Sequence, residues 1–474
     1  MAKYCWPLLG HLPIFLGPPV NIASLAFRGI EGDVVEANII GARFYLIRGA
    51  PLLKSILGFS SLRMRKTTVD DESTKLLFMH HAGIVLNDHI PLWKRSRKFL
   101  VESIGRSRFH KALTPGMNVY MKSLCAKMNS LSIEKKPILA NKLMASISID
   151  VITKIVLGEL RTSAEYYVQS TVDLGFVLAQ TDPFLVLMTK FQRVWNFLAM
   201  TPSILYKNLP WLKSKMKDYK IVIQELQDFI EVRVREIQAN LNSQPQDDAL
   251  DRDLTTNILI ATNNGFAETV ACVKEAIIGG QGTTSTSLSF VMYELARHPA
   301  VVEEIYHEII STLDSNSDEF TDETIKKMPL LQASIYEIHR LYSIAVMVDR
   351  GLEEDLEVGN MTLKKGSQLL FTLGLNHHDE REWKDPKIFN PHRFLQMEES
   401  PGPLGCGYSF SPFGYGMRKC PGQALAMLEM ALVIAHLVKH FKFHLVNRNM
   451  TVKIDEFGML RECLDLPIQF VSRH

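Results

Sequence analysis

The stretch "FGYGMRKCPG", Phe413–Gly422, places one cysteine among glycines and basic residues, directly before a long apolar run. Pro421 suits the first position of a helix, so Cys420 is expected just outside a helix N-terminus. The free backbone N–H groups and the dipole of that helix favour a thiolate at this position. A thiolate that binds a metal cofactor would need something like this setting. For the cysteine taken alone, a buried free thiol beside a chance glycine loop remains the favoured alternative.

The residues around the cysteine suit a flat ligand that carries negative charge. Gly416 and Gly422 permit tight turns and a close approach of the backbone to such a ligand. Arg418 can pair with an anionic group on it. A thiolate on haem iron donates electron density that favours O–O bond cleavage, and N–H bonds to the sulfur tune the potential.

The composition limits the class of function. The chain has 474 residues, 46% of them hydrophobic, and a net charge of +2. It can therefore bury a large core and shows no bias toward nucleic acid or another strongly charged partner. Its six cysteines stand without CxxC or CxxCH spacing, which disfavours zinc ribbons, iron–sulfur clusters and c-type haem. So sparse a set indicates a reducing compartment.

The hydrophobic pattern predicts a mainly helical chain with a small β-rich part. Residues 32–57 alternate β-rich runs with glycine and end in a helix signal. Residues 90–310 are mostly helical, and residues 266–298 keep a helical pattern well beyond the usual length. Short strands return later, and a last apolar helix is expected over Pro421–Val438. Residues 242–253 are predicted to be an exposed loop between helices.

The cysteine segment matches F-x-x-G-x-R-x-C-x-G, the haem-ligand signature of the cytochrome P450 superfamily, which the chain resembles over nearly its whole length. The resemblance implies a mainly α cytochrome P450 fold, with a large helical haem domain and a small β-rich part. It implies a single haem domain over residues 1–474. Within it, 1–15 would be a proline-rich hinge and possible engineered leader, 32–57 the β-rich part and 90–474 the haem-binding core. Cys420 would be the axial ligand of haem b.

The resemblance also assigns further residues to the cofactor. Inside the cysteine segment these are Phe413, Gly416, Arg418 and Gly422. Outside it, Trp93 and Arg97 of "WKRSR" resemble the W-x-x-x-R pair that contacts a haem propionate. Arg350 resembles a second propionate partner.

Two more motifs resemble a structural ion-pair network of the family. Glu337 and Arg340 of "EIHR" are one helical turn apart and so share a face. Arg393 of "FNPHRF" corresponds to the arginine that completes the network. Taken alone, "EIHR" would usually be a solvated helix pair, and only the order and spacing of the motifs favour the network.

The long helix contains "GGQGTTS", Gly279–Ser285, which resembles the family motif A/G-G-x-D/E-T-T/S. The resemblance predicts a kink that makes room for O2, with Thr283 and Thr284 as catalytic residues that bind oxygen and relay protons. Gly282 departs from the family, because most members carry an acid there. Without it the relay must run through water, Thr284 or Gln281. From the residues alone, a helix-packing site remains the alternative.

Two smaller features receive no catalytic role. Ser343 stands where the family usually has proline, and it is expected to change only a turn. The pairs His80–His81 and His377–His378 have no carboxylate or second histidine at ligand spacing outside the family motifs, so a metal site there is disfavoured.

Residues 183–212 are unusually apolar and aromatic. In family position they roof the substrate pocket and often dip into the membrane, although ordinary core packing explains them equally well. "WPLLGHLP" resembles the hinge after a membrane anchor, and no apolar run of about 20 residues precedes it. We expect a place on the cytosolic face of the endoplasmic reticulum membrane. Cationic residues at 95–98 can help to dock NADPH–cytochrome P450 reductase.

The first hypothesis is a monooxygenase that inserts one atom of O2 into an apolar sterol, steroid, terpenoid or fatty acid, with electrons from an NADPH-dependent reductase. The second is a reductase-independent isomerase or dehydratase of lipid peroxides, which Gly282 favours and Thr283 opposes. The third is a non-catalytic haem or lipid binder. It is the weakest, because every haem-site motif is present.

Overall fold

The computed structural model describes residues 27–28, 31–39, 42–57, 64–65, 70–104, 107–201, 203–243, 252–263, 265–313, 319–395, 407–457 and 460–473. The predicted hinge at 1–15 lies outside these residues. So does most of the segment 242–253, although the flanking helices end at Ser243 and begin at Leu254.

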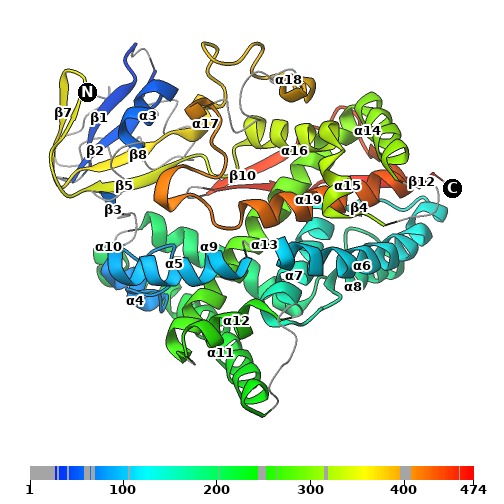
Figure 1. Cartoon of the computed structure of the whole chain (residues 1–474), viewed down its shortest axis with the longest axis horizontal. Coiled ribbons are helices and arrows are strands. Elements are labelled where there is room, and N and C mark those ends of the chain that lie inside the picture. The colour runs from blue at the N-terminus through cyan, green and yellow to red at the C-terminus, as the bar shows by residue number, and fades with distance from the viewer. Residues whose placement is uncertain are drawn as a thin grey trace.

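A small β-rich end adjoins a larger body of helices (Figure 1). The helices are α3 (Ala50–Leu57), α4 (Asp71–Leu76), α5 (Ile90–Ile104), α6 (Ser107–Ile133), α7 (Ala140–Leu157), α8 (Ser163–Leu174), α9 (Pro183–Met200), α10 (Ser203–Asn208), α11 (Pro210–Ser243), α12 (Leu254–Ala261), α13 (Phe266–Arg297), α14 (Pro299–Thr312), α15 (Asp322–Lys326), α16 (Pro329–Tyr342), α17 (Leu373–Asn376), α18 (His392–Leu395) and α19 (Gln423–His440). Proline begins α9, α14 and α16, where its missing N–H costs no hydrogen bond.

The strands are short and form separate sheets. They are β1 (Val34–Ile39), β2 (Ala42–Ile47), β3 (Met64–Arg65), β4 (Ile138–Leu139), β5 (Val348–Leu352), β6 (Leu356–Val358), β7 (Met361–Leu363), β8 (Gln368–Phe371), β9 (Phe441–Leu445), β10 (Lys453–Phe457), β11 (Leu460–Leu464) and β12 (Pro467–Ser472). The largest sheet has the order β1-β2-β8-β5-β3, with β2 and β8 parallel and the other neighbours antiparallel. It therefore joins segments about 300 residues apart.

Helix α13 runs through the middle of the helical body (Figure 1). It packs against α7, α11, α16 and α19, and most of its residues are buried. A helix that other helices enclose needs no polar stripe, which explains its long apolar pattern. A separate, smaller cluster of buried side chains lies between the large sheet and α3.

The predicted mainly α fold with a small β-rich part is confirmed. Helix α13 has nearly the predicted bounds. The last helix begins at Gln423, not at Pro421, and Gly422 is its N-cap, so the prediction that Pro421 is the first helical residue is wrong. A turn occupies residues 421–422, and Gly422, with φ −85° and ψ 7°, departs from helical geometry.

Candidate functional site

The segment that carries Cys420 is a tightly closed loop ahead of α19. The Cys420 N–H donates to the Phe413 carbonyl at 2.9 Å, and the Lys419 N–H donates to the Gly416 carbonyl at 3.1 Å. Gly416 has φ 69°, a left-handed conformation that suits glycine. A Cβ added at Gly422 would lie 3.9 Å from the Cys420 sulfur. The loop thus presents the sulfur while its own backbone closes round it.

Cys420 is exposed by surface area, yet burial raises the pKa of its thiol. Both hold if the sulfur faces a hollow enclosed by protein. The Gly422 N–H bond and the charges of Arg97 and Lys419 act the other way and lower this pKa. A thiolate without a cation is therefore costly here, whereas a metal cation bound to the sulfur would displace its proton.

Two arginines from distant parts of the chain, Arg97 and Arg350, lie near Arg418 of this loop. Burial lowers the pKa of Arg97, Arg350 and Arg418. The pKa of Arg418 falls to about 10, chiefly through burial and then through repulsion by Arg350 and Arg97. Each donates a hydrogen bond to a backbone carbonyl: Arg97 to Lys419 at 2.6 Å, Arg418 to Ile84 at 3.2 Å and Arg350 to Asp349 at 2.6 Å.

Trp93 joins this arginine cluster. Its ring centroid lies 4.0 Å from the Arg418 guanidinium and 5.6 Å from that of Arg97. Trp93 Nε1 and one Arg418 terminal nitrogen are buried with no hydrogen-bond partner among the described residues. Buried donors without partners are uncommon in native proteins. Unpaired donors among crowded cations fit a polyanionic ligand, and the two carboxylates of a haem beside a cysteine sulfur would meet this requirement.

The middle of α13 has open space beside one of its glycines. Gly279 is exposed although the helix around it is mostly buried, and a Cβ added there would meet nothing within 4 Å. At Gly280 glycine is needed for a different reason, because an added Cβ would lie 2.5 Å from Ile152 Cδ1 of α7. The first glycine therefore leaves space, and the second permits close helix packing.

Thr283 lies one turn after Gly279, and its hydroxyl donates to the Gly279 carbonyl at 2.7 Å. Thr284 is buried. Residues 279–285 remain helical throughout, and the predicted kink stays a prediction. Side-chain hydroxyls that bond to carbonyls one turn back bend helices slightly, and Ser285, Ser287 and Ser289 do the same on this helix.

A chain of contacts links Thr283 to the cysteine loop. The Ser287 hydroxyl lies 2.9 Å from the Thr283 carbonyl and 3.3 Å from His339 Nε2. The His339 ring lies 5.2 Å, centroid to centroid, from that of Phe413. Burial lowers the pKa of His339 to about 4, so its imidazole is neutral at physiological pH.

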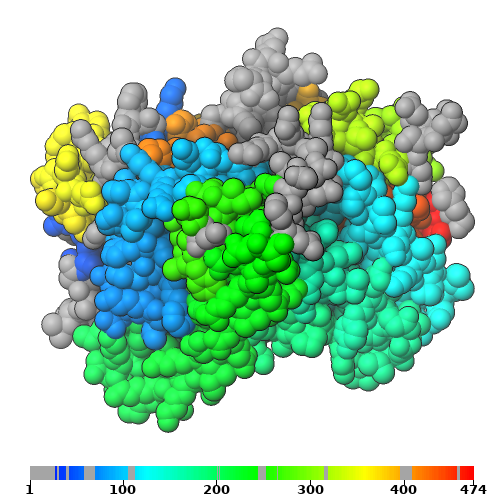
Figure 2. All heavy atoms as spheres, turned by 60° about the horizontal axis from the view of Figure 1, so that its bottom comes forward, coloured from blue at the N-terminus to red at the C-terminus, as the bar shows by residue number. Residues whose placement is uncertain are grey.

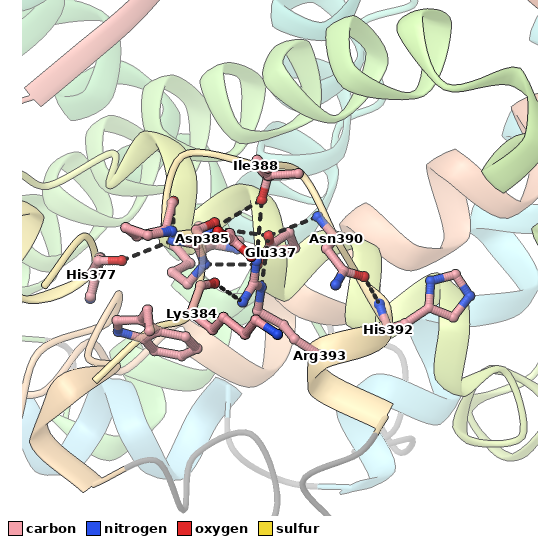
Figure 3. A network of polar contacts seen from close by, with 12 residues as sticks. Glu337, His377, Lys384, Asp385, Ile388, Asn390, His392 and Arg393 are labelled. Atoms are coloured by element: carbon pink, nitrogen blue, oxygen red, sulfur yellow. Dashed lines mark hydrogen bonds and ion pairs between the residues drawn. The ribbon is translucent and has the colours of Figure 1, made fainter. Parts of the chain in front are cut away.

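Glu337, Arg340 and Arg393 form a buried ion-pair network (Figure 3). Arg340 donates two bonds to Glu337, at 2.8 and 2.9 Å, and Arg393 donates to the same carboxylate at 3.1 Å. The Glu337 and Arg340 side chains are 0% exposed. Their remaining donors bond to carbonyls, such as that of His377 at 3.0 Å from Arg340.

His377 links this network to Ser411, which lies shortly before the cysteine loop. Its Nε2 accepts from the Ser411 N–H at 3.0 Å, and its Nδ1 lies 2.6 Å from the Ser343 hydroxyl. Ser343 ends α16 with φ 42°, which proline cannot adopt. The expectation that Ser343 changes only a turn is therefore wrong, since it also orients a buried histidine. The pair His377–His378 was noted in the sequence only as a possible metal site, and nothing in it predicted the contact with Ser343.

Helix α13 also holds the segment 77–85, a feature that motif reasoning missed. Lys274 is buried, and its ammonium bonds to the carbonyls of Leu77 at 2.7 Å and Phe78 at 3.3 Å, and to Gln227 Oε1 at 2.8 Å. The adjacent Glu275 accepts from the N–H groups of Ile84 and Val85. Two adjacent charges in the apolar run "ACVKEAIIGG" were the available signal.

The predicted roof, residues 183–212, is α9, α10 and the start of α11. Figure 2 shows this segment in green beside α4 and α5 in blue. It is joined to α4 by a hydrogen bond between the Tyr206 and Ser73 hydroxyls and by one from the Ser203 N–H to Asp70. Ile204 and Trp211 are about two-thirds exposed, at 67% and 66%.

One described helix, α19, is long and apolar enough to cross a membrane by length and composition. It is mostly buried within the protein, as core helices that pass the same test are.

Comparison with known proteins agrees with the geometry. Residues 3–466 match the family described as "Cytochrome P450". Human aromatase is 28% identical over 92% of this chain and 81% of its own. Human cytochrome P450 3A5 is 26% identical over 80% of this chain and 74% of its own, and rabbit (Oryctolagus cuniculus) cytochrome P450 3A6 is 28% identical over the same shares. The chain therefore belongs to the cytochrome P450 family of haem-thiolate enzymes.

Proposed function

We propose that this enzyme is a monooxygenase that inserts one oxygen atom of O2 into an apolar small molecule and takes its electrons from an NADPH-dependent flavoprotein reductase. Monooxygenation is the general activity of the family. The observation that supports it in this chain is Thr283, whose hydroxyl lies on the same helix face as the open space at Gly279.

Each side chain has a part in this proposal. Cys420 would bind the iron of haem b, and Phe413, Gly416 and Gly422 shape the loop that presents the sulfur. Trp93, Arg97, Arg350 and Arg418 would bind the two haem carboxylates. The bound haem supplies the site at which O2 is reduced and cleaved. Thr283, with Thr284 beside it, would hold a proton at its hydroxyl oxygen and pass it toward the open side of α13.

The substrate class follows from the character of the roof. Phe191, Trp195 and Phe197 on α9 are buried or half-buried, and α9 contacts α13. Such a surface suits a sterol, steroid, terpenoid or fatty acid. The exposed Ile204 and Trp211 beside it suit a membrane surface, which supports a place at the endoplasmic reticulum.

The rival is a reductase-independent rearrangement or dehydration of lipid peroxides, which the missing acid at Gly282 favours. The test is turnover of mixed sterols, steroids, fatty acids and lipid hydroperoxides under labelled O2, with and without reductase and NADPH, read by mass spectrometry. Label in product only with reductase and NADPH is the expected result. Peroxide consumed without reductase, and without label, would show the rival activity instead.

A second experiment tests the part that Thr283 has in this activity. Thr283→Ala is expected to go on consuming NADPH while it forms less labelled product, by roughly tenfold or more, because proton delivery is impaired. Unchanged product per NADPH in this variant would remove Thr283 from the relay.

A further inference from the structure

The open face of α13 is covered at one point by a side chain from a distant helix. A Cβ added at Gly282, where most family members carry an acid, would lie 3.6 Å from Gln192 Oε1 of α9. Gly282 lies three residues after Gly279 and Thr283 lies four residues after it, so the two flank Gly279 on one side of the helix. The amide oxygen of Gln192 therefore faces the space that an acidic side chain at position 282 would occupy.

The orientation of Gln192 leaves this oxygen available. Its Nε2 donates to Asn196 Oδ1 at 3.2 Å, which directs the oxygen away from Asn196. No described residue donates to Gln192 Oε1. The residue is half-buried, so a small ligand can reach it.

The groups that the sequence suggested for the relay lie elsewhere. Gln281 is 8% exposed and Thr284 is 3% exposed, and they lie two and five residues after Gly279, a spacing that does not bring side chains to the same face. At about 100° per residue, Gln281 and Thr284 lie roughly 160° and 140° round the helix from Gly279, on the side away from the open space. Neither side chain therefore replaces the missing acid as directly as Gln192 does.

We propose that Gln192 is a positioning residue that holds a water molecule over Gly282, from which Thr283 receives its proton. The inference rests on the proposed monooxygenase activity. The water donates one hydrogen to Gln192 Oε1 and turns the other toward the Thr283 hydroxyl. An amide oxygen orients water without ionising, so this step lacks the carboxyl titration that an acid at position 282 would add.

The test removes the water site from each helix in turn. Gln192→Leu removes the acceptor without opening a large cavity, and Gly282→Ala places a methyl 3.6 Å from the amide oxygen, where a water bonded at about 2.8 Å would have to lie. The double variant completes a cycle. Because both substitutions displace one water, their effects should not add. Gln224→Leu is the matched control, since its Nε2 makes a similar bond one turn along, to Asp228, on the exposed side of α11.

The first readout needs no substrate and no turnover. The infrared stretch of carbon monoxide bound to the reduced protein is measured in H2O and D2O, because it senses hydrogen bonding on the open side of the haem. Wild type and Gln224→Leu should show a solvent-isotope shift, whereas Gln192→Leu, Gly282→Ala and the double variant should all lose it. An isotope shift that persists in Gln192→Leu would overturn the proposal. So would a double variant whose change in the stretch equals the sum of the changes in the two single variants.

The second readout separates this inference from the proposed function. Product formed per NADPH is expected to fall roughly tenfold in Gln192→Leu and in Gly282→Ala. If Thr283→Ala loses coupling but Gln192→Leu does not, the water site is refuted and the monooxygenase stands. If wild type incorporates no labelled oxygen, the proposed function itself fails.

Discussion

The cysteine side and the α13 side of the site differ in how many of their polar groups already have hydrogen-bond partners. On the cysteine side, the Arg340 donors are directed to Glu337 and to carbonyls, and the side chains of both residues have no exposed surface. On the α13 side, Gly279 faces open space and Gln192 keeps an uncommitted oxygen. A fixed side suits a cofactor that is the same in every relative. A less committed side suits a substrate and a relay that differ among them.

The largest effect is expected at the fixed side. Glu337→Gln leaves the Arg340 charge buried without a full partner, and losing one member of a buried pair costs about 3–5 kcal/mol. We expect poor folding and little bound haem, measured by urea unfolding and by haem content of the purified protein. The matched control is Glu236→Gln, which breaks the exposed Arg233 pair and should cost less than about 1 kcal/mol. Equal effects in the two variants would contradict the contrast between the two sides.

A smaller, pH-dependent effect is expected at Lys274 on α13. Burial lowers the pKa of Lys274 to about 8 from 10.5, so the unfolded chain binds this proton more tightly than the folded one. Stability should therefore rise with pH between about 8 and 10.5, by roughly 3 kcal/mol at most.

The measurement is the difference in unfolding free energy between wild type and Lys274→Met across this pH range. Subtraction removes the tyrosines and other lysines, which titrate in both proteins. The difference should change by the stated amount as pH rises. A difference that stays constant would show that Lys274 has an ordinary pKa.

The third prediction separates two effects of one substitution. Arg418 is partly desolvated and repelled by Arg350 and Arg97, so Arg418→Met should leave the unfolding temperature of the haem-free protein unchanged or higher. The same variant should lose haem about ten- to a hundredfold faster, because a charged hydrogen bond contributes about 1.5–3 kcal/mol. Thermal unfolding of the haem-free protein measures its stability, and haem transfer to an acceptor globin measures the rate of haem loss. A destabilised haem-free protein with unchanged haem loss would mean that Arg418 only supports the fold.

The residues on the cysteine side could be predicted from the sequence, because they belong to motifs with a fixed order and spacing. The spacing of Glu337 and Arg340, three residues apart on one helix, already places both on one face. The predicted start of α19 was two residues too early, because a turn at residues 421–422 precedes the helix. Helix propensity alone does not contain it.

The open side was beyond the sequence for a related reason. Gly282 is visible as a departure, but the side chain that faces it comes from position 192, and only the packing of α9 on α13 brings the two together. Ser343 and His377 are likewise 34 residues apart. Such pairs have no fixed spacing in the chain, so no local pattern predicts them.

The central claim is that Cys420 is the cysteine that binds the haem iron. The most direct measurement is the spectrum of the reduced, carbon monoxide-bound protein, compared among wild type, Cys420→Ser and Cys463→Ser. Cys463 is buried, and burial raises the pKa of its thiol, so it serves as the control. The thiolate-type spectrum should be present in wild type and Cys463→Ser and absent from Cys420→Ser. A thiolate-type spectrum that persists in Cys420→Ser would contradict the account.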